Sequence, residues 1–355
     1  MIDIVFNKKE FEYDAYTLIK AFYPQEEVSI LYEGEEKTES SQKTEEAFLV
    51  VKITYNKEDT RLAILKNKET VFEETIFSAS DDERKERKNK LKQALYRGLS
   101  KETKKVLPWG DLTGIRPTKI AMGLIESGMS NVETAEFMRN TYYTSNEKTA
   151  LAITIANRER ALLADIDYKN GYSLYVGIPF CPSICLYCSF SSYPLAKWRD
   201  KVDAYLDALC KELTYIGETM KVRTLDTIYI GGGTPTTLEP EQLERLLSHI
   251  ECCFPTREVK EYTIEAGRPD SITREKLEVI RKYPVTRISV NPQTMNQATL
   301  DLIGRRHTVE DTRHAFALAR ECGFDNINMD LIVGLPGECA KDVQKTLEEV
   351  KKMEP

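Results

Sequence analysis

The sequence predicts an α/β protein in two parts: a small α+β domain over residues 1–165, and a longer run of βα units over residues 166–355. Three observations predict this class. The chain has 355 residues, more than one ordinary hydrophobic core accommodates. Short β-branched and aromatic runs fill its start, whereas apolar strands alternate with helical patterns from Gly171 onwards. The polar stretch 165–170 between these textures is the expected domain boundary.

The N-terminal part begins with runs of β-branched and aromatic residues that are typical of strands. We expect strands over residues 1–6, 28–33, 48–55 and 60–65. The polar segment 34–46 is expected to be a flexible loop. Short strands separated by polar turns indicate a small antiparallel sheet.

A helix is expected next, over residues 81–97. Its acidic residues come first and its basic residues follow, which suits the helix dipole, and an apolar stripe runs from Leu91 to Leu99. The basic residues could contact nucleic acid. Because acids are interspersed among them, a solvated helix face is the favoured interpretation.

The segment 107–119 interrupts the helical pattern with two prolines and two glycines, which predicts an ordered turn whose default role is packing. Two helices are expected after it. Ser130 and Thr144 each have a glutamate three residues later, the spacing of a capping box. The second of these helices is expected to end at about residue 163.

Repeated βα units predict that the second part is built on parallel strands. The expected strands are residues 173–178, 227–230, 262–266, 287–290 and 327–333, and helical patterns lie near 195–220, 240–252, 273–282, 295–303, 308–322 and 341–353. Such a sheet can stay open or curl towards a barrel. In both cases ligands gather at the carboxyl ends of the strands.

The strongest chemical signal follows the first of these strands, where Cys181, Cys185 and Cys188 stand at Cys-x3-Cys-x2-Cys spacing. Thiolates at this density suit an iron–sulfur cluster. In a cubane [4Fe–4S] cluster each cysteine binds a different iron, so three thiolates leave one iron open to a small-molecule ligand. The alternative is a group of buried, unpaired thiols, and the crowding of the three cysteines favours the cluster.

Glycines and a carboxylate follow the next two strands. Gly231–Gly233 remove Cβ atoms where a ligand must approach the backbone, although a tight turn also explains three glycines. No glycine-rich phosphate-binding pattern accompanies them. Glu265 could accept hydrogen bonds from ribose hydroxyls or from an ammonium group; its alternative is a solvated carboxylate.

Polar residues also follow the last two strands. Gln293 could both donate and accept hydrogen bonds, or form a turn. An arginine at 305 or 306 could clamp a carboxylate, or both could be exposed. Asp330 lies in an apolar run and needs a partner if it is buried. Because all five strands end in such features, the sequence indicates one site on one edge of the sheet.

Composition narrows the class of protein. The net charge of −7 gives no global attraction to phosphate backbones or anionic membranes, and it counts against nucleic acid as a partner. No apolar segment approaches membrane-spanning length. The eight cysteines show no disulfide-framework spacing, so we expect a cytoplasmic protein.

These motifs together resemble the radical S-adenosylmethionine superfamily. Tyr175-x-x-Ile-Pro-Phe-Cys, Gly-Gly-Gly-Thr-Pro-Thr, Ile-Gly-Arg-x-His-Thr and Asn-x-Asp-Leu-Ile-x-Gly-Leu-Pro-Gly are similar to the oxygen-independent coproporphyrinogen III oxidase (coproporphyrinogen dehydrogenase) family. Asn-Pro-Gln-Thr-Met and the segment 107–119 resemble its HemZ branch. The resemblance implies a (β/α) barrel. Family members continue beyond the helix that ends this chain, so we expect an incomplete barrel, truncated at the C-terminus.

The resemblance also implies the cofactors and their ligands. A [4Fe–4S] cluster would bind Cys181, Cys185 and Cys188. S-adenosylmethionine would bind the open iron, and its implied contacts are Tyr175, Tyr187, Gly232, Gly233, Thr234, Glu265, Gln293, Arg305 and Asp330. These are cofactor-binding residues, and the resemblance identifies no catalytic residue.

The family's reaction converts propionate side chains of coproporphyrinogen III to vinyl groups and yields protoporphyrinogen IX, a step in heme biosynthesis. It implies a tetrapyrrole substrate and a reductant protein such as a flavodoxin or ferredoxin. Gly177 and Phe190 stand where the best-studied members carry a histidine and a fourth cysteine. Relatives that act as heme chaperones also lack that fourth cysteine. A heme-binding protein without decarboxylase activity is therefore the alternative.

Overall fold

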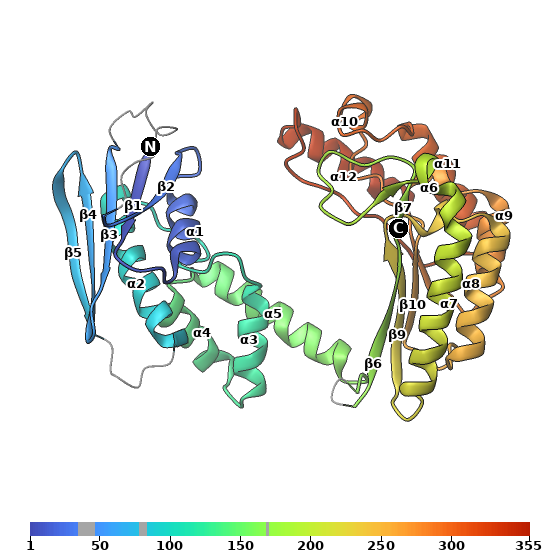
Figure 1. Cartoon of the computed structure of the whole chain (residues 1–355), viewed down its shortest axis with the longest axis horizontal. Coiled ribbons are helices and arrows are strands. Elements are labelled where there is room, and N and C mark those ends of the chain that lie inside the picture. Colours follow the sequence, from blue (N-terminus) through green and yellow to red (C-terminus); the bar gives the residue numbers. More distant parts are fainter. Residues whose placement is uncertain (35–46, 78–83, 168–169) are drawn as a thin grey trace. The chain divides into compact units, whose positions relative to one another are not determined.

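The computed structural model describes residues 1–34, 47–77, 84–167 and 170–355. The chain divides into two compact units, Met1–Ala164 and Asp165–Pro355 (Figure 1). The predicted loop over residues 34–46 lies, apart from Gly34, outside the described residues, and so do the first three residues of the helix expected at 81–97. That the two units are independent domains stays a prediction.

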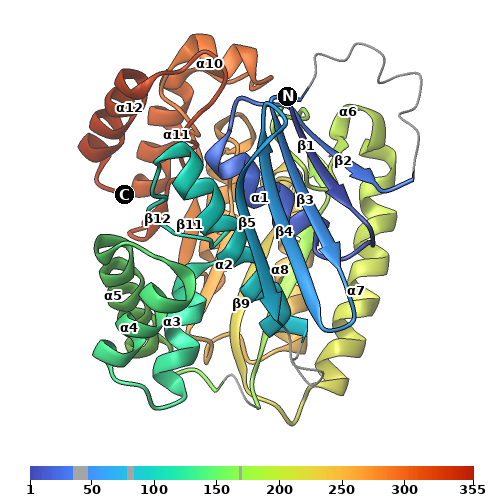
Figure 2. The same cartoon turned by 90° about the vertical axis from the view of Figure 1, so that its left-hand side faces the viewer.

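The N-terminal unit contains a five-stranded sheet in the order β2-β1-β3-β4-β5 (Figure 2). Its elements are β1 Ile2–Phe6, α1 Glu12–Phe22, β2 Val28–Tyr32, β3 Leu49–Tyr55, β4 Asp59–Lys66 and β5 Glu69–Phe77. The prediction of an antiparallel sheet is wrong for half of it, because β1 pairs in parallel with both β2 and β3. The helix α1, which the sequence analysis did not anticipate, provides the crossover that parallel β1 and β2 require.

Helices complete this unit: α2 Arg84–Thr103, α3 Pro117–Glu126, α4 Asn131–Tyr142 and α5 Asn146–Leu163. Ser130 forms the predicted capping box with Glu133. The expected cap at Thr144 is wrong by one residue: the Ser145 hydroxyl accepts the amide hydrogen of Lys148. α3 was not anticipated either, since Pro117 and the glycines before it read as a turn.

The second unit is built on a sheet in the order β12-β11-β10-β9-β6, in which every neighbouring pair is parallel. The strands are β6 Tyr172–Ile178, β9 Leu225–Gly232, β10 Glu261–Glu265, β11 Arg287–Ser289 and β12 Ile327–Asn328, with a short β7 Phe180–Cys181 and β8 Tyr193–Pro194 beside them. The α/β class and the parallel sheet are confirmed. Among the described residues the sheet is open, with β6 and β12 at its edges.

Helices follow the strands: α6 Leu195–Trp198, α7 Val202–Thr219, α8 Pro240–Cys253, α9 Arg274–Arg281, α10 Gln297–Leu302, α11 Val309–Glu321 and α12 Ala340–Met353, with single 3₁₀ turns at Arg199–Lys201, Pro235–Thr237 and Pro269–Ser271. In Figure 1, α7 and α8 lie along one face of the sheet formed by β6, β9 and β10. Side chains from these elements make one core, in which Leu206, Leu246 and Ile264 are fully buried. This packing fixes the strand ends on which the candidate site is built.

The last strand is shorter than predicted, because β12 ends at Asn328 rather than at residue 333. Beyond it the chain leaves the sheet and forms an isolated bridge between Gln293 and Leu331. No helix of the described part of the chain is long and apolar enough to span a bilayer.

Candidate active site at the strand ends

The carboxyl ends of the parallel strands and the cysteine loop surround one pocket of about 140 Å³. It is lined by Cys181, Ser183, Cys185, Tyr187, Cys188, Phe190, Ser192, Gly232, Gly233, Thr234, Glu265, Gly267, Arg268, Asn291, Gln293, Arg305 and Asp330. Of the site residues predicted from the sequence, Tyr175 alone does not line it. Residues separated by up to 149 positions therefore meet at one edge of the sheet, as parallel βα topology dictates.

The cysteine loop is held by hydrogen bonds to the segment after α10. The Leu186 amide donates to the Ile303 carbonyl at 3.0 Å, and the Ser183 hydroxyl donates to the Gly304 carbonyl at 2.9 Å. All three cysteines of the loop are free thiols and are partly buried. Burial raises the pKa of the Cys181 thiol, and a hydrogen bond from Thr234 acts in the opposite direction. The loop thus presents three thiol groups towards the strand ends without consuming them in disulfides.

The three thiol groups of the loop fit an iron–sulfur cluster. Among the described residues, no three His, Cys, Asp or Glu side chains converge on one ion position. A cubane cluster does not require such convergence, since each cysteine binds a different iron. Polar groups approach two of the sulfurs: the Thr234 hydroxyl is 3.6 Å from the Cys181 Sγ atom, and an Arg268 nitrogen is 3.7 Å from the Cys185 Sγ atom. Such contacts stabilise thiolates.

The glycine turn after β9 passes directly beside the cysteine loop. Gly232 has a φ of +104°, a conformation that favours glycine. At Gly233, a Cβ atom would lie 2.6 Å from the Phe180 carbonyl oxygen and 2.9 Å from the Cys181 Sγ atom. The Gly233 amide donates to the Ile178 carbonyl at 2.7 Å. The glycines are therefore required by a close approach of two backbones, which the sequence alone did not distinguish from an ordinary tight turn.

Glu265 at the end of β10 is half-buried, and burial raises the pKa of its carboxyl group. The Tyr229 hydroxyl donates a short hydrogen bond to it. The Tyr229 ring in turn stacks on Tyr175, with centroids 5.9 Å apart. Tyr175 is 61% exposed on β6, and Tyr229 links it to the Glu265 carboxylate.

Gln293 and Asp330 meet where the chain leaves β11 and β12. Gln293 has a φ of +66°, which is unusual for a residue with a side chain, and it is buried. The backbone amide of Gln293 donates to the backbone carbonyl of Asp330 at 3.0 Å. The Asp330 carboxylate is exposed rather than buried, and it accepts hydrogen bonds from Asn291 at 3.0 Å and Asn328 at 2.7 Å. Strained backbone of this kind is concentrated at functional sites.

The two adjacent arginines have different environments. Arg305 is 5% exposed and donates to the Asn291 carbonyl at 2.5 Å, whereas Arg306 is exposed. The Arg305 Nε atom is buried and has no hydrogen-bond partner among the described residues. Burial raises the pKa of Tyr187 to about 12, against the opposing charge of Arg305. A buried arginine with an unused N–H group is suited to bind an acceptor from a ligand.

Arg268, three residues after Glu265, is a pocket residue that the sequence analysis did not single out. It is 3% exposed, pairs with the Asp270 carboxylate at 2.8 Å, and reaches the Ser183 hydroxyl at 3.1 Å. His307 lies behind this pair, buried, with its Nδ1 atom 3.9 Å from Asp270. Burial lowers the pKa of His307 to about 4. The sequence offered one indication of this role: Arg268 follows Gly267 directly after the end of β10, as the other site residues follow their strands.

Comparison with known proteins adds independent information. Residues 175–350 match the Radical SAM superfamily. The oxygen-independent coproporphyrinogen-III oxidase-like protein HemZ of Bacillus subtilis is 37% identical over 341 residues, which cover 93% of this chain and 66% of HemZ. The heme chaperone HemW of the same organism is 40% identical over 176 residues, covering 49% of this chain and 46% of HemW.

Among solved structures, coproporphyrinogen III oxidase (HemN) from Escherichia coli is 31% identical, with a TM-score of 0.48, over 56% of this chain and 45% of HemN. The chain thus spans about two thirds of the length of HemZ and less than half of HemW and HemN. The chain belongs to the radical S-adenosylmethionine superfamily, whose members use a [4Fe–4S] cluster and S-adenosylmethionine, and its relatives there include HemZ and HemW.

Proposed function

We propose that this protein is an oxygen-independent coproporphyrinogen III oxidase that converts propionate side chains to vinyl groups. The observation that carries the proposal is the pocket in which the three cysteines meet residues at the carboxyl ends of β9, β10, β11 and β12. The similarity to HemZ over most of the chain, with a relative named for this activity, supports the choice of substrate.

In this proposal Cys181, Cys185 and Cys188 hold the cluster, and the pocket beside them holds S-adenosylmethionine. When bound, these cofactors supply a radical that removes a hydrogen atom from a substrate carbon. Gly232 and Gly233 line the pocket beside the cysteine loop, where their backbone faces the amino and carboxylate groups of the cofactor. The unused N–H group of Arg305 is available to a ligand carboxylate or carbonyl.

The remaining predicted contacts orient the rest of the cofactor. The Glu265 carboxylate, fixed by Tyr229, accepts hydrogen bonds from hydroxyl groups. Asp330, held by two asparagines, supplies a second acceptor, and Gln293 supplies both a donor and an acceptor. Tyr187 covers the cysteine side of the pocket, and Tyr175 acts through the stack on Tyr229. Their shared task is to fix the reacting atoms and exclude water.

The alternative is a heme-binding chaperone on the same fold. Phe190 favours it: this side chain lines the pocket and is 72% exposed, at the position where the best-studied oxidases carry a fourth cysteine. The chain is 40% identical to HemW over 176 residues, against 37% identity to HemZ over 341 residues. In both cases the partner is a tetrapyrrole. A flavodoxin or ferredoxin as electron donor, and a reducing, cytoplasmic location that keeps all eight cysteines free, belong to the proposal.

The test uses the full-length protein, reconstituted with iron and sulfide without oxygen. It is incubated with S-adenosylmethionine, a strong reductant and coproporphyrinogen III, and the tetrapyrroles are separated by chromatography. Protoporphyrinogen IX, formed with consumption of S-adenosylmethionine, is the expected result. Cys185→Ala serves as the control and should form none.

Stoichiometric binding of heme, with S-adenosylmethionine cleaved but no vinyl product formed, would contradict the oxidase and support the chaperone. An absence of both vinyl product and heme binding in a protein with a full cluster would contradict both functions.

A further inference from the structure

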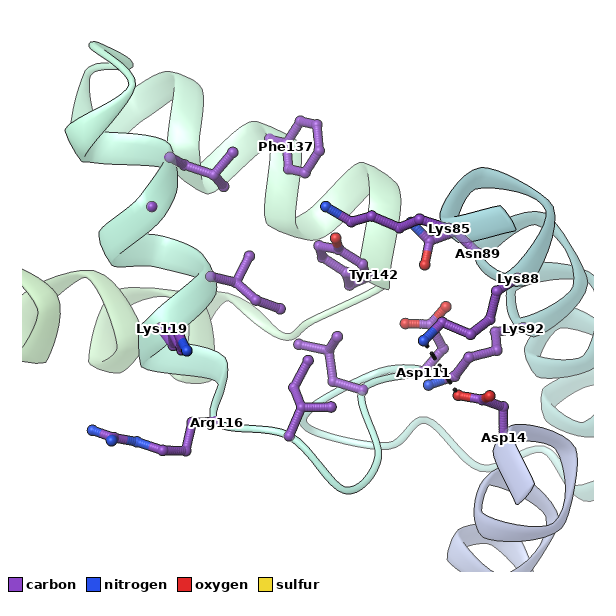
Figure 3. A pocket seen from close by; sticks show the side chains of 15 residues that line it. Asp14, Lys85, Lys88, Asn89, Lys92, Asp111, Arg116, Lys119, Phe137 and Tyr142 are labelled. Carbon is purple, nitrogen blue, oxygen red and sulfur yellow. Dashed lines mark ion pairs between the residues drawn. The ribbon is translucent and has the colours of Figure 1, made fainter. Parts of the chain in front are cut away.

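A second pocket, of about 520 Å³, lies entirely within the N-terminal unit (Figure 3). Its walls come from α1, α2, the segment 104–116, α3 and α4. The lining residues are Asp14, Lys85, Lys88, Asn89, Lys92, Asp111, Leu112, Ile115, Arg116, Lys119, Ile120, Gly123, Leu124, Phe137 and Tyr142. None of them belongs to the strand-end site, so the pocket needs an explanation of its own.

Positive charge exceeds negative charge in this pocket. Lys85, Lys88, Lys92, Arg116 and Lys119 face two carboxylates, Asp14 and Asp111. In Figure 3, Lys85, Lys88 and Lys92 extend from α2 towards Asp111 and Tyr142, while Arg116 and Lys119 belong to the opposite wall. The chain as a whole has a net charge of −7, so this concentration of cations is local. An electropositive concavity attracts anions.

Ion pairs within the protein neutralise only part of that charge. Lys88 pairs with Asp14 at 3.7 Å, and Arg116 pairs with Glu159 at 3.3 Å; all four side chains are at least partly exposed, and such pairs are weak. Within the described ranges, Lys85 and Lys119 have no carboxylate partner. Two exposed ammonium groups thus remain available on opposite walls of the pocket.

Asp111 shows that the floor of the pocket is also incompletely satisfied. It is 1% exposed, and its Oδ1 atom has no hydrogen-bond partner in the described part of the chain. The buried Lys92 ammonium nearby donates to the Thr113 hydroxyl at 3.3 Å instead. A buried carboxylate oxygen without a hydrogen-bond donor destabilises the folded state. A ligand that presents an N–H or O–H group would remove that penalty.

The backbone is built to hold Asp111 in this position. Gly110 has a φ of +60°, and a Cβ atom there would lie 1.8 Å from the Tyr142 carbonyl oxygen. The Asp111 amide donates to that same oxygen at 3.0 Å. The Leu107–Lys119 motif, which the sequence indicated only as a packed turn, therefore delivers Asp111, Arg116 and Lys119 to the pocket.

The remaining walls are apolar. Leu112, Ile115, Ile120, Leu124 and Phe137 contribute hydrocarbon surface, and Ile115 and Phe137 remain 49% and 36% exposed. Phosphate or sulfate alone would leave these side chains in water. Cations, a hydrogen-bond acceptor and apolar walls together fit a molecule that carries acidic groups on a hydrophobic body.

We propose that this pocket binds a small organic polyanion: a molecule with two or more carboxylate or phosphate groups on an aromatic or aliphatic body, and with a hydrogen-bond donor that reaches Asp111. The acidic groups lie between the ammonium groups of α2 and the Lys119 ammonium of α3. The apolar body lies against Ile115 and Phe137. The site does not depend on the function proposed for the strand ends.

The test measures binding of two probes to the full-length protein by titration calorimetry: coproporphyrin III for carboxylates and ATP for phosphates. The variant Lys85→Glu/Lys119→Glu reverses two exposed charges of the pocket. Lys57→Glu/Lys101→Glu reverses two exposed charges of the same unit outside it. We expect one probe to bind the wild-type protein, to lose at least about tenfold in affinity in the first variant, and to change less than about twofold in the second.

The two probes distinguish the source of the acidic groups. If the Lys85→Glu/Lys119→Glu variant loses affinity for coproporphyrin III alone, the ligand carries carboxylates. If it loses affinity for ATP alone, the ligand carries phosphates. If neither probe binds the wild-type protein, or if a bound probe is unaffected in a Lys85→Glu/Lys119→Glu protein with a wild-type circular dichroism spectrum, the proposal is wrong. Because Cys185→Ala leaves this pocket unchanged, binding that disappears only in that variant belongs to the strand-end site.

Discussion

At the scale of single residues, Arg268 is the side chain that gives the cysteine loop an electrostatic environment. It is buried, keeps a two-point pair with Asp270, and directs its Nη1 atom towards the Cys185 sulfur at 3.7 Å. Hydrogen bonds to cluster sulfurs stabilise the more negative, reduced state and raise the reduction potential. Arg268 is therefore expected to be a positioning residue that also tunes the cluster.

Arg268→Lys tests this role, because lysine keeps the positive charge beside Asp270 but lacks the Nη1 group that reaches the Cys185 sulfur. We expect the midpoint potential of the reconstituted cluster to fall by about 60 mV, since a charge-assisted hydrogen bond contributes roughly 1.5 kcal/mol and 59 mV corresponds to a tenfold change. Iron and sulfide content should stay constant. Arg306→Lys, at an exposed neighbouring position, is the control. Equal potentials in all three proteins would exclude the contact.

Asp111 gives a pH-dependent stability whose sign follows from its burial. Burial raises the pKa of this carboxyl group to about 7, against the opposing charge of Lys92. Lys88 and Asp14 lie nearby on α2 and α1, and Tyr142 lies nearby on α4. The folded state therefore keeps a proton, between about pH 4 and pH 7, that the unfolded state releases. The contribution of Asp111 to the free energy of unfolding therefore falls as pH rises through that interval.

Asp111→Asn removes this titration while keeping the shape of the side chain. Chemical denaturation at a series of pH values measures the free energy of unfolding. Between pH 4 and pH 7, that of the wild-type protein should fall by up to about 1.4 kcal/mol per pH unit relative to that of the variant. Above pH 7 the difference should become constant. Parallel curves over the whole range would mean that Asp111 titrates normally in the folded protein.

The sequence could identify which residue types belong to the site, but not how each is held. Arg305 and Arg306 are adjacent and identical, and only tertiary packing buries the first and exposes the second. The left-handed backbone of Gln293 results from its bridge to Leu331, a contact made 38 residues later in the chain. Such properties depend on long-range neighbours that no local pattern encodes.

At the scale of elements, the turn after β9 is the part of the site with the least steric freedom. Gly233→Ala would place a methyl group 2.9 Å from the Cys181 Sγ atom and 2.6 Å from the Phe180 carbonyl oxygen. We expect this variant to lose most of its reconstituted iron and sulfide, measured per chain, because the loop must move away from the strand ends.

Gly123→Ala is the matched control, since a Cβ atom there meets nothing within 4 Å. It lies inside α3, where alanine is favoured over glycine by about 1 kcal/mol, so its cluster content should match the wild-type protein. Full cluster occupancy in Gly233→Ala would show that the glycine turn and the cysteine loop are further apart than the structure indicates.

Elements were predictable where the local signal was strong. The strands and helices of the second unit follow periodic apolar patterns, and Ser130 with Glu133 identified the start of α4 correctly. The N-terminal sheet was harder. Its strands are recognisable by composition, but strand direction depends on the connection, and α1 was not recognised as a crossover between β1 and β2. At the start of α5, adjacent Thr144 and Ser145 compete for the cap, and Thr144 instead shares a buried hydrogen bond with Thr149.

At the scale of the whole molecule, the sequence predicted the site residues of the second unit but not the pocket of the first unit. Cysteines, glycines and carboxylates at strand ends lie on one edge by the logic of parallel sheets, so their assembly was foreseeable. The pocket of the first unit, for which we propose a polyanionic ligand, combines residues from Asp14 to Tyr142 on four helices and on the segment between α2 and α3. No spacing rule connects those positions, and only the folded arrangement brings them together.

The central claim is that Cys181, Cys185 and Cys188 hold a [4Fe–4S] cluster whose open iron binds S-adenosylmethionine in the strand-end pocket. Electron paramagnetic resonance of the anaerobically reduced, reconstituted full-length protein tests it most directly. We predict the signal of a reduced [4Fe–4S] cluster, a change in that signal when S-adenosylmethionine is added, and no such cluster in Cys185→Ala. A wild-type signal in Cys185→Ala, or a spectrum that S-adenosylmethionine leaves unchanged, would contradict the account.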